Sequence, residues 1–571
     1  MLRKFLLSAG VAALTVGGAA PVAAQGYAGA YLAGRHAAAN SDYVAAAKYF
    51  AEALRRDTQN VELMDSAAMS YLSLGDIDKA RPVAEQMVEL GQRTQVAHLV
   101  LTAAQAGAGE YDAILASKGD PSGIGPWVNG LVKAWAKVGK GDMTAALADF
   151  DTMAEEEGMR AFVNYHKALA LASVGDFEGA EAIFEGGLAG SAGQTRRGVM
   201  ARAEILSQLE KFEEAGALLK ESFGDSVDPE LEDMMGALEA RETMPFTHVP
   251  DATAGIAEVF FTFAAVLRSE AAGDYYVLLY SRVARYLRPD HIDALLMTAE
   301  LLENLGQYDL AIEEYKAVPA AAPAYHAAEL GRAAALRRSG KTEQAIEVLE
   351  LLSRSHGDLA PVHSALGDAL RSEEDYLGAI AAYDRALERT AESNPARWVL
   401  YYSRGISEER SGDMESAERD FRAALEINPD QPQVLNYLGY SLVEEGRNLD
   451  EALEMIERAV AKSQNSGYIV DSLGWVLYRL GRYEEAVDHM ERAVELIAND
   501  PVVNDHLGDV YWAVGREREA EFQWRRALSF IDKDDTDGEA DPDRIRRKLD
   551  VGLDQVLAEE GADPLTKVAA D

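Results

Sequence analysis

Few residues in this sequence have a type and spacing that could support catalysis or ligand binding. The tetrapeptide SGKT at 339–342 resembles the end of a phosphate-binding loop, but that loop needs an earlier glycine where this chain has Ala335. The acidic segment 532–543 resembles a calcium loop, yet Lys533 and Arg544 occupy ligand positions that need carboxylates. The ten histidines do not pair with acids at metal-ligand spacing, and the chain has no cysteine. We therefore expect no catalytic residue, no metal and no cofactor; an enzyme with an unrecognised site is the remote alternative.

The balance of charge limits the partners that this chain could bind. Of its 571 residues, 96 are acidic and 55 are basic, which gives a formal net charge of −41. Such a surface repels the phosphate backbone of nucleic acids, so we expect no nucleic-acid partner. It could attract basic partners, but a long, solvated helical surface also explains the excess of acids.

The N-terminus has the layout of a secretory signal peptide. Arg3 and Lys4 precede a short apolar run, and small residues follow it. Val22 and Ala24 suit the −3 and −1 positions of a cleavage site, so the mature chain would begin at Gln25. The apolar run is too short to span a membrane comfortably, and we find no later stretch that approaches its length. We expect a periplasmic protein with a cleavable signal and no membrane insertion of the mature chain; an uncleaved anchor is the alternative.

A pattern of helix, tight turn and second helix repeats along most of the chain. It is clear in the segment 473–496, LGWVLYRLGRYEEAVDHMERAVEL, and similar repeats begin near 27, 61, 95, 127, 161, 196, 258, 292, 326, 360, 398, 432, 467 and 501. Eight of the thirteen spacings are 34 residues, and Gly or Ala holds the eighth place in thirteen of the fourteen repeats, which chance does not produce. Two helices approach closely only where side chains are small. Because one pair cannot bury its apolar face alone, the repeats should stack into a solenoid.

This pattern resembles the tetratricopeptide repeat over most of residues 27–531, and most clearly from 258 onward. The stretches NYLGYSLVEEGRNLDEALEMIERAV, DSLGWVLYRLGRYEEAVDHMERAV and NDHLGDVYWAVGREREAEFQWRRAL are similar to the C-terminal end of a group of exported bacterial proteins. That group includes outer-membrane adaptor lipoproteins that recruit carboxyl-terminal processing proteases. Since this chain has no cysteine to acylate, the membrane anchor of those lipoproteins does not carry over.

The resemblance implies an all-α superhelical solenoid of antiparallel helix pairs that acts as an adaptor and binds a protein or peptide partner on its concave face. A carboxyl-terminal processing protease and an envelope assembly factor are the candidate partners. The alternative function is a structural scaffold in envelope or polysaccharide-export assembly, in which the repeats bridge several proteins.

Departures from the period suggest how the chain is organised. We expect a signal peptide at 1–24, an N-terminal array at 25–224 and a C-terminal array at 258–531. The connector between them, 225–257, contains ARETMPFTHVPDATAG, whose two prolines break the helical period. Residues 532–571 should form an acidic linker and a helix that caps the solenoid, with one apolar face made of Ile545, Leu549, Leu553, Val556 and Leu557.

The same resemblance locates a binding surface in the last three repeats. In this family the first helix of each repeat lines the concave face through roughly its second, fifth, ninth and twelfth places. These places are held by Gln433, Asn436, Tyr440, Val443, Tyr468, Asp471, Trp475, Tyr478, Val502, Asp505, Asp509 and Trp512. Aromatic side chains supply rigid contact area, and an Asn amide can hydrogen-bond an extended peptide backbone.

The residues at the fifth place indicate what kind of segment would bind. Some family members clamp a terminal carboxylate with Lys and Asn, but here Asp471 and Asp505 hold that place. We therefore expect a neutral or basic segment rather than a free C-terminus. The alternative interpretation is that Trp475 and Trp512 only pack between neighbouring repeats.

Overall fold

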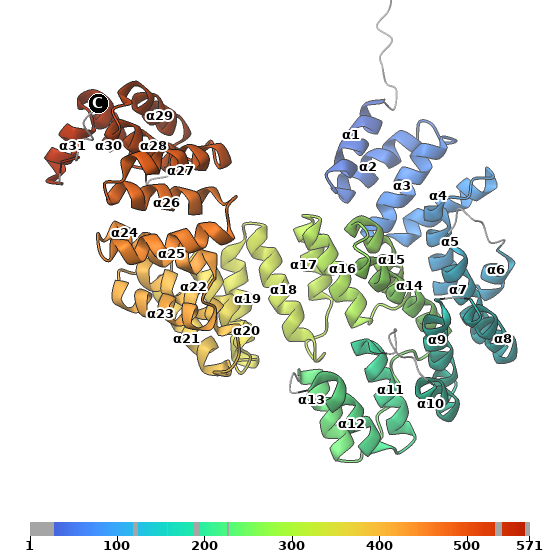
Figure 1. Ribbon diagram of the computed structural model, residues 1–571. Helices are drawn as coiled ribbons and strands as arrows, with labels where there is room; N and C mark the ends of the chain where they lie inside the picture. The colour runs from blue at the N-terminus through green and yellow to red at the C-terminus, as the bar shows by residue number, and fades with distance from the viewer. Residues whose placement is uncertain are drawn as a thin grey trace, which may run out of the picture. The chain divides into compact units, whose positions relative to one another are not determined.

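The computed structural model describes residues 28–117, 124–156, 158–186, 194–224, 228–531, 540–562 and 564–565 (Figure 1). These residues form 31 helices, and none of them lies in a β-strand. The predicted signal peptide at 1–24 lies outside the described residues, as do residues 532–539 of the predicted acidic linker. The helices divide into two compact units, residues 1–348 (unit 1) and 349–571 (unit 2), and each is described by itself.

Unit 1 consists mainly of antiparallel helix pairs. Their first helices are α1 (Ala28–Ala39), α3 (Val61–Leu74), α5 (Gln95–Gly107), α7 (Pro126–Gly139), α9 (Arg160–Ser173), α11 (Arg196–Gln208), α14 (Ala252–Ser269), α16 (Ile292–Asn304) and α18 (Tyr325–Arg338). Their second helices are α2 (Tyr43–Leu54), α4 (Ile77–Glu89), α6 (Tyr111–Ala116), α8 (Met143–Ala154), α10 (Phe177–Glu185), α12 (Phe212–Phe223), α15 (Asp274–Leu287) and α17 (Tyr308–Lys316). The next helix, α19 (Thr342–Ser355), contains the division between the units.

Unit 2 continues the same pattern. Its first helices are α20 (Ala360–Ser372), α22 (Arg397–Arg410), α24 (Pro432–Glu444), α26 (Gly467–Arg479) and α28 (Pro501–Ala513). Its second helices are α21 (Tyr376–Arg389), α23 (Met414–Ile427), α25 (Leu449–Lys462), α27 (Tyr483–Leu496) and α29 (Glu517–Phe530). Across both units, thirteen of the fourteen predicted repeat starts lie within one residue of the start of a first helix, which confirms the helical-repeat fold.

The small residues at the eighth place let the two helices of a repeat approach closely, as the sequence predicts. A Cβ on Gly405 would lie 2.8 Å from the Phe421 ring, and a Cβ on Gly439 would lie 2.7 Å from the Ile456 side chain. The large partner is fully or almost fully buried in each case. In these two repeats the second helix therefore packs directly onto the backbone of the first helix, because the position that faces it carries no side chain.

The one remaining repeat start, predicted at 258, was wrong because α14 begins six residues earlier, at Ala252. This helix and α15 fold back onto the first helices of the N-terminal array and pack against α3, α5, α7 and α9. A Cβ on Gly255 would overlap the ring of Trp135, and Arg282 donates from Nε to the carbonyl oxygen of Ser73 at 2.9 Å. The part of the inner face of the N-terminal array that α3, α5, α7 and α9 form is thus covered by the chain's own α14–α15 hairpin.

This fold-back also explains where the two units divide. The division falls inside the predicted C-terminal array, at Val348 and Leu349, rather than in the predicted connector. The connector itself is not wholly irregular, because it contains α13 (Pro229–Glu239), whose N-terminus is capped by the side chain of Asp228. Since α14–α15 belong structurally to the N-terminal array, the repeats that follow them directly remain in unit 1.

The length and composition of α14 would allow it to cross a membrane. Its 18 residues have a mean hydropathy of 1.3, so the expectation that no later stretch resembles a span needs correction. However, 56% of this window is buried inside unit 1. Its apolar character is explained by its position in the core, between helices of the N-terminal array.

The C-terminus covers the end of unit 2 with two helices rather than the single predicted one. They are α30 (Pro542–Val551) and α31 (Leu553–Glu560), separated by Gly552, which has a φ of 84°. A Cβ on Gly552 would lie 2.6 Å from the Trp512 ring, so glycine allows both the turn and the close contact. Ile545, Leu553 and Val556 are buried and Leu549 and Leu557 are partly buried against unit 2, as a cap requires.

Candidate functional site

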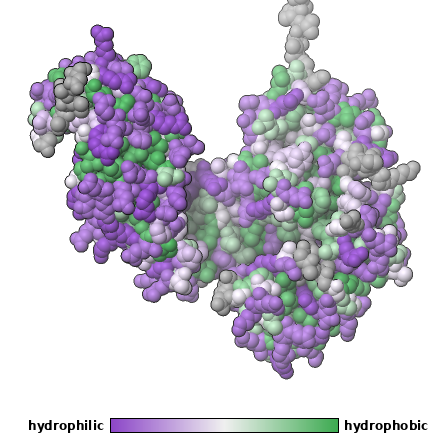
Figure 2. Space-filling model, viewed as in Figure 1, coloured by the Kyte–Doolittle hydropathy of each residue, from purple (hydrophilic) through white to green (hydrophobic). Residues whose placement is uncertain are grey.

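A cleft of about 940 Å³ opens on the first-helix side of unit 2. It is formed by α24 and α26, by the C-terminal end of α22, by the first residues of α28 and by residues around the end of α29. Figure 2 shows hydrophobic residues gathered on the visible face of unit 2 at the level of α24 and α26, among mostly hydrophilic residues. The volume lies within the usual range for ligand sites.

Four of the ten predicted site residues line this cleft: Asn436, Tyr440, Tyr468 and Asp471. The Tyr468 side chain is 61% exposed, so its ring is available to a partner. The Oδ1 atom of Asn436 is buried and has no hydrogen-bond partner within the described chain. Because an unsatisfied buried acceptor is costly, this oxygen favours a ligand that donates a hydrogen bond. Gln433 is exposed and lies outside the cleft.

Trp475 packs between repeats, as the alternative interpretation proposed. Its ring stacks on His506 of the next first helix, with centroids 3.9 Å apart, and on Tyr478 at 4.8 Å. Its Nε1 donates to Glu444 of the preceding first helix at 2.7 Å. Tyr478 is only 8% exposed, and burial raises its pKa well above the usual value. These two aromatic residues therefore join three repeats rather than line the cleft.

The prediction that Asp505 and Asp509 face a partner was wrong. Both carboxylates are buried and accept from Nζ of Lys548 in α30, at 2.9 Å and 2.6 Å respectively. Asp509 also accepts from Nε1 of Trp524 at 2.8 Å. Trp512 packs on Trp524, with centroids 5.4 Å apart. The cap, whose placement the repeat pattern does not encode, covers this end of the inner face.

The aspartate at the fifth place of α26 has an internal partner. Asp471 is 5% exposed and lies 3.1 Å from Nδ1 of His506. Although burial disfavours the charged imidazolium, the Asp471 carboxylate raises the pKa of His506 above its usual value. When His506 is protonated, this pair contributes less negative charge to the cleft than a free carboxylate would.

The cleft is nevertheless strongly acidic. Its described lining contains five acids and one base: Glu409, Glu444, Glu445, Asp471, Asp500 and Arg410. Glu409, Glu444, Glu445 and Asp500 lie at or next to helix ends, at places outside the four-place pattern, so the pattern missed them. A wider stripe that included the sixth and tenth places would also have found Tyr437 and Ser441, which line the cleft beside Asn436 and Tyr440.

Within the described ranges, the structure shows no cluster of residues arranged as a metal centre. In the part of the chain that the structure describes, no group of three or more His, Cys, Asp or Glu side chains is arranged to hold a metal ion. The residues that line the cleft offer hydrogen bonding, aromatic contact and the attraction of positive charge.

Comparison with known proteins identifies the repeats. The tetratricopeptide-repeat family model matches six overlapping segments: 278–326, 296–360, 330–397, 364–432, 402–467 and 438–501. A curated relative, the TPR repeat-containing protein PA4667 of Pseudomonas aeruginosa, is 28% identical over 156 residues, which are 27% of this chain and 26% of the relative. The match thus spans about a quarter of that protein's length.

Solved structures of other repeat proteins resemble the chain. The crystal structure of the APC/C hetero-tetramer Cut9–Hcn1 matches with a TM-score of 0.40 and 14% identity, over 92% of this chain and 96% of that one. Yeast Tom70 matches with a TM-score of 0.33 and 14% identity, over 94% of this chain and 98% of that one. The helix pairs of residues 278–501 therefore match the tetratricopeptide-repeat family, and the same pattern of antiparallel helix pairs continues on both sides of this segment.

Proposed function

We propose that the chain is a protein-interaction scaffold that holds an extended segment of a partner protein in the cleft of unit 2. The observation that carries the proposal is the acidic cleft in which the unsatisfied Oδ1 of Asn436 lies beside Tyr440 and the exposed ring of Tyr468. The Asn436 oxygen would accept from a backbone N–H, and the two tyrosines would supply contact area. Solenoid proteins commonly bind partners along such surfaces.

The partner segment should be basic or neutral rather than acidic. Five acids and one base line the cleft, so a basic segment is attracted and an acidic one is repelled. A free C-terminal carboxylate would meet this negative field without a lysine to pair with it. We therefore favour an internal, basic or neutral segment.

The proposed location is the periplasm, based on the signal-like N-terminus. Of the candidate partners, a carboxyl-terminal processing protease or an envelope assembly factor fits an adaptor with one binding cleft. A scaffold that bridges several envelope or polysaccharide-export proteins would instead need further binding surfaces. On this proposal the chain has no catalytic activity of its own.

Photo-crosslinking from the cleft tests the proposed function. With p-benzoylphenylalanine at position 468, cells should give a discrete adduct with one protein, and Asn436→Ala with Tyr440→Ala should reduce its yield about tenfold, as expected for a loss of about 1.4 kcal/mol of binding energy. The same probe at the exposed Leu377 of α21 is the control, since it lies outside the cleft. Equal adducts from both positions, or an adduct unaffected by the double substitution, would contradict the proposal.

Export gives a second test. The intact mass of the protein recovered by osmotic shock should correspond to a chain that starts at Gln25, with allowance for cyclisation of this glutamine. Retention of residues 1–24 in the released protein would rule out the cleavable signal, and recovery only with the membrane fraction would favour the uncleaved anchor.

A further inference from the structure

A second cavity, of about 620 Å³, lies in unit 1, where the α14–α15 hairpin leaves part of the N-terminal array uncovered. One wall is formed by α9, α11 and α13. The opposite wall is formed by α14, by residues 247–248 before it and by residues around the start of α16. Its volume is typical of sites for small molecules.

Much of this lining is apolar and adaptable. The apolar side chains include Phe162, Met200, Met234, Phe261 and Val266. Methionine side chains have several rotatable bonds and adjust to the shape of what they contact. The cavity thus suits a ligand with a substantial apolar body.

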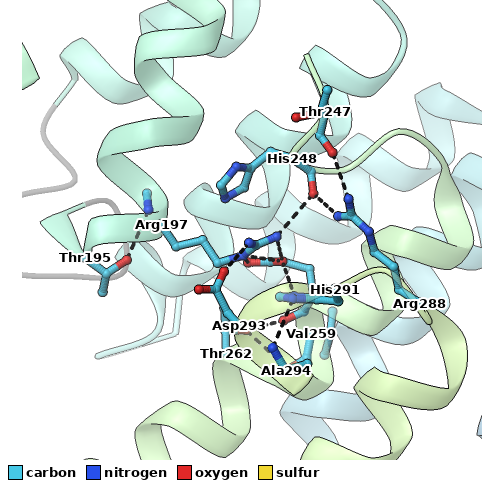
Figure 3. Close-up of polar contacts among 12 residues, drawn as sticks. Thr195, Arg197, Thr247, His248, Val259, Thr262, Arg288, His291, Asp293 and Ala294 are labelled. Atoms are coloured by element: carbon cyan, nitrogen blue, oxygen red, sulfur yellow. Dashed lines mark hydrogen bonds and ion pairs between the residues drawn. The ribbon is translucent and has the colours of Figure 1, made fainter. Parts of the chain in front are cut away.

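The arginines at the cavity already have partners, some of which Figure 3 shows, and Glu204 accepts hydrogen bonds from Thr247 and from the backbone N–H of His248. Arg197 lies 2.8 Å from the buried Glu258 and 2.7 Å from Asp293. Arg196 is paired in the same way with acids at the start of α13, at 2.8 and 2.9 Å. Arg288 donates to the backbone oxygens of Thr247 and His248. A charged ligand would therefore have to displace an existing partner.

His248 is bonded to this network through its backbone but not through Nε2 of its imidazole ring. Arg197 and Arg288 hold its backbone oxygen, while Glu204 accepts from its backbone N–H at 3.2 Å. Figure 3 shows its imidazole turned away from Arg288. The side chain is 8% exposed, and its Nε2 has no hydrogen-bond partner within the described residues. Burial, together with the charge of Arg197, holds the pKa of His248 well below its usual value, so the ring is neutral.

The neighbouring histidine differs from His248 because it is part of the network. Nδ1 of His291 accepts from the backbone N–H of Ala294 at 3.2 Å, and its Nε2 lies 3.5 Å from Glu258. Within the described residues Nε2 of both histidines lacks a hydrogen bond, but Nε2 of His291 lies near Glu258, whereas Nε2 of His248 has no such carboxylate neighbour. The geometry favours one hydrogen bond to a ligand rather than several.

We propose that this cavity binds an uncharged, mainly apolar small molecule with one hydrogen-bonding group, which is received by the imidazole of His248. The proposal rests on the apolar walls, the arginines that already have partners and the unpartnered Nε2, and it is independent of the cleft in unit 2. Such a ligand would contact both walls and so join the hairpin to the N-terminal array.

Nile red, which is uncharged, apolar and carries a carbonyl acceptor, is a suitable probe for the full chain at neutral pH. Its fluorescence should rise and saturate. Ala265→Trp, which places a large ring in the cavity, should weaken binding at least tenfold, and His248→Phe should weaken it several-fold. Ala461→Trp, at an exposed position of α25, is the matched control and should leave binding unchanged.

Two results would overturn the proposal. The first is Nile red binding that survives both Ala265→Trp and His248→Phe. The second is binding that is lost in Tyr468→Ala, which would place the dye in the cleft of unit 2. If Ala265→Trp has a lower melting temperature than the unsubstituted chain, the site is tested by hydrogen exchange instead of by this variant. Nile red should slow exchange in residues 196–208 and 252–269 of the unsubstituted chain, and unchanged exchange there would contradict the site.

Discussion

Replacing Lys548 with methionine should destabilise the C-terminal cap of unit 2 by about 3–5 kcal/mol, because it removes the cation that both buried carboxylates share and leaves only Arg544, 3.7 Å from Asp509, nearby. Lys548 is 1% exposed, and its Nζ lies 2.9 Å from Asp505 and 2.6 Å from Asp509. Hydrogen exchange should show that α30 and α31 lose protection first, and the melting temperature of unit 2 should fall.

Two matched variants show whether the effect comes from the buried charges. Arg546→Met removes a cation from the same helix, but Arg546 is 61% exposed, so its loss should cost only about 0–1 kcal/mol. Adding Asp505→Asn and Asp509→Asn to Lys548→Met should recover part of the lost stability, since no buried charge then remains unpaired. Equal effects of Lys548→Met and Arg546→Met would show that the buried pairing contributes little.

Acidification should destabilise unit 1 by a comparable amount through His166. Burial lowers the pKa of His166 from 6.5 to about 4, and this ring faces Trp135, Thr262 and, at longer range, Glu258. Below pH 6.5 His166 binds a proton in the unfolded chain but stays neutral in the folded chain. The free energy of unfolding of unit 1 therefore falls as the pH falls. Between pH 6.5 and 4 the loss is about 3 kcal/mol for this residue, at 1.36 kcal/mol per pH unit.

The second unit provides an internal control for this pH effect. The pKa of His506 is raised, so its contribution to stability is fully present below its unfolded value and is lost as the pH rises through the folded one. Hydrogen exchange at pH 7.5 and pH 5 should therefore show α9 becoming less protected on acidification, without a matching loss in α28. In His166→Gln, which keeps hydrogen-bonding groups but does not titrate, the loss in α9 should be smaller. An unchanged pH dependence in that variant would assign the effect to other groups.

The repeats could be predicted from the sequence because each one is defined by contacts within about 34 residues. Gly405 and Phe421 are 16 positions apart, and their sizes are complementary, so the pattern of small and large residues reveals the helix pair. The start of α14 could not be read in this way, because Gly255 is small in order to fit Trp135, which belongs to a repeat more than a hundred residues earlier.

The candidate site was predictable only where neighbouring repeats decide exposure. Asn436, Tyr440 and Tyr468 lie in the cleft because repeat geometry alone places them there. Asp505 and Asp509 have equivalent places in the last repeat, but Lys548 of the cap reaches them from 39 to 43 residues away. Sequence spacing does not indicate that contact, because the sequence around a lysine does not distinguish an exposed side chain from one buried in a core.

The fold-back of α14–α15 changes how unit 1 should unfold. In a simple repeat array each repeat contacts only its neighbours, so cooperativity spreads along one dimension and the ends can fray separately. Here the bond from Arg282 to Ser73 joins positions 209 residues apart. The N-terminal repeats and the hairpin should therefore melt as one cooperative block. During synthesis the N-terminal repeats also emerge first, and their apolar inner face stays uncovered until residues 252–287 have followed.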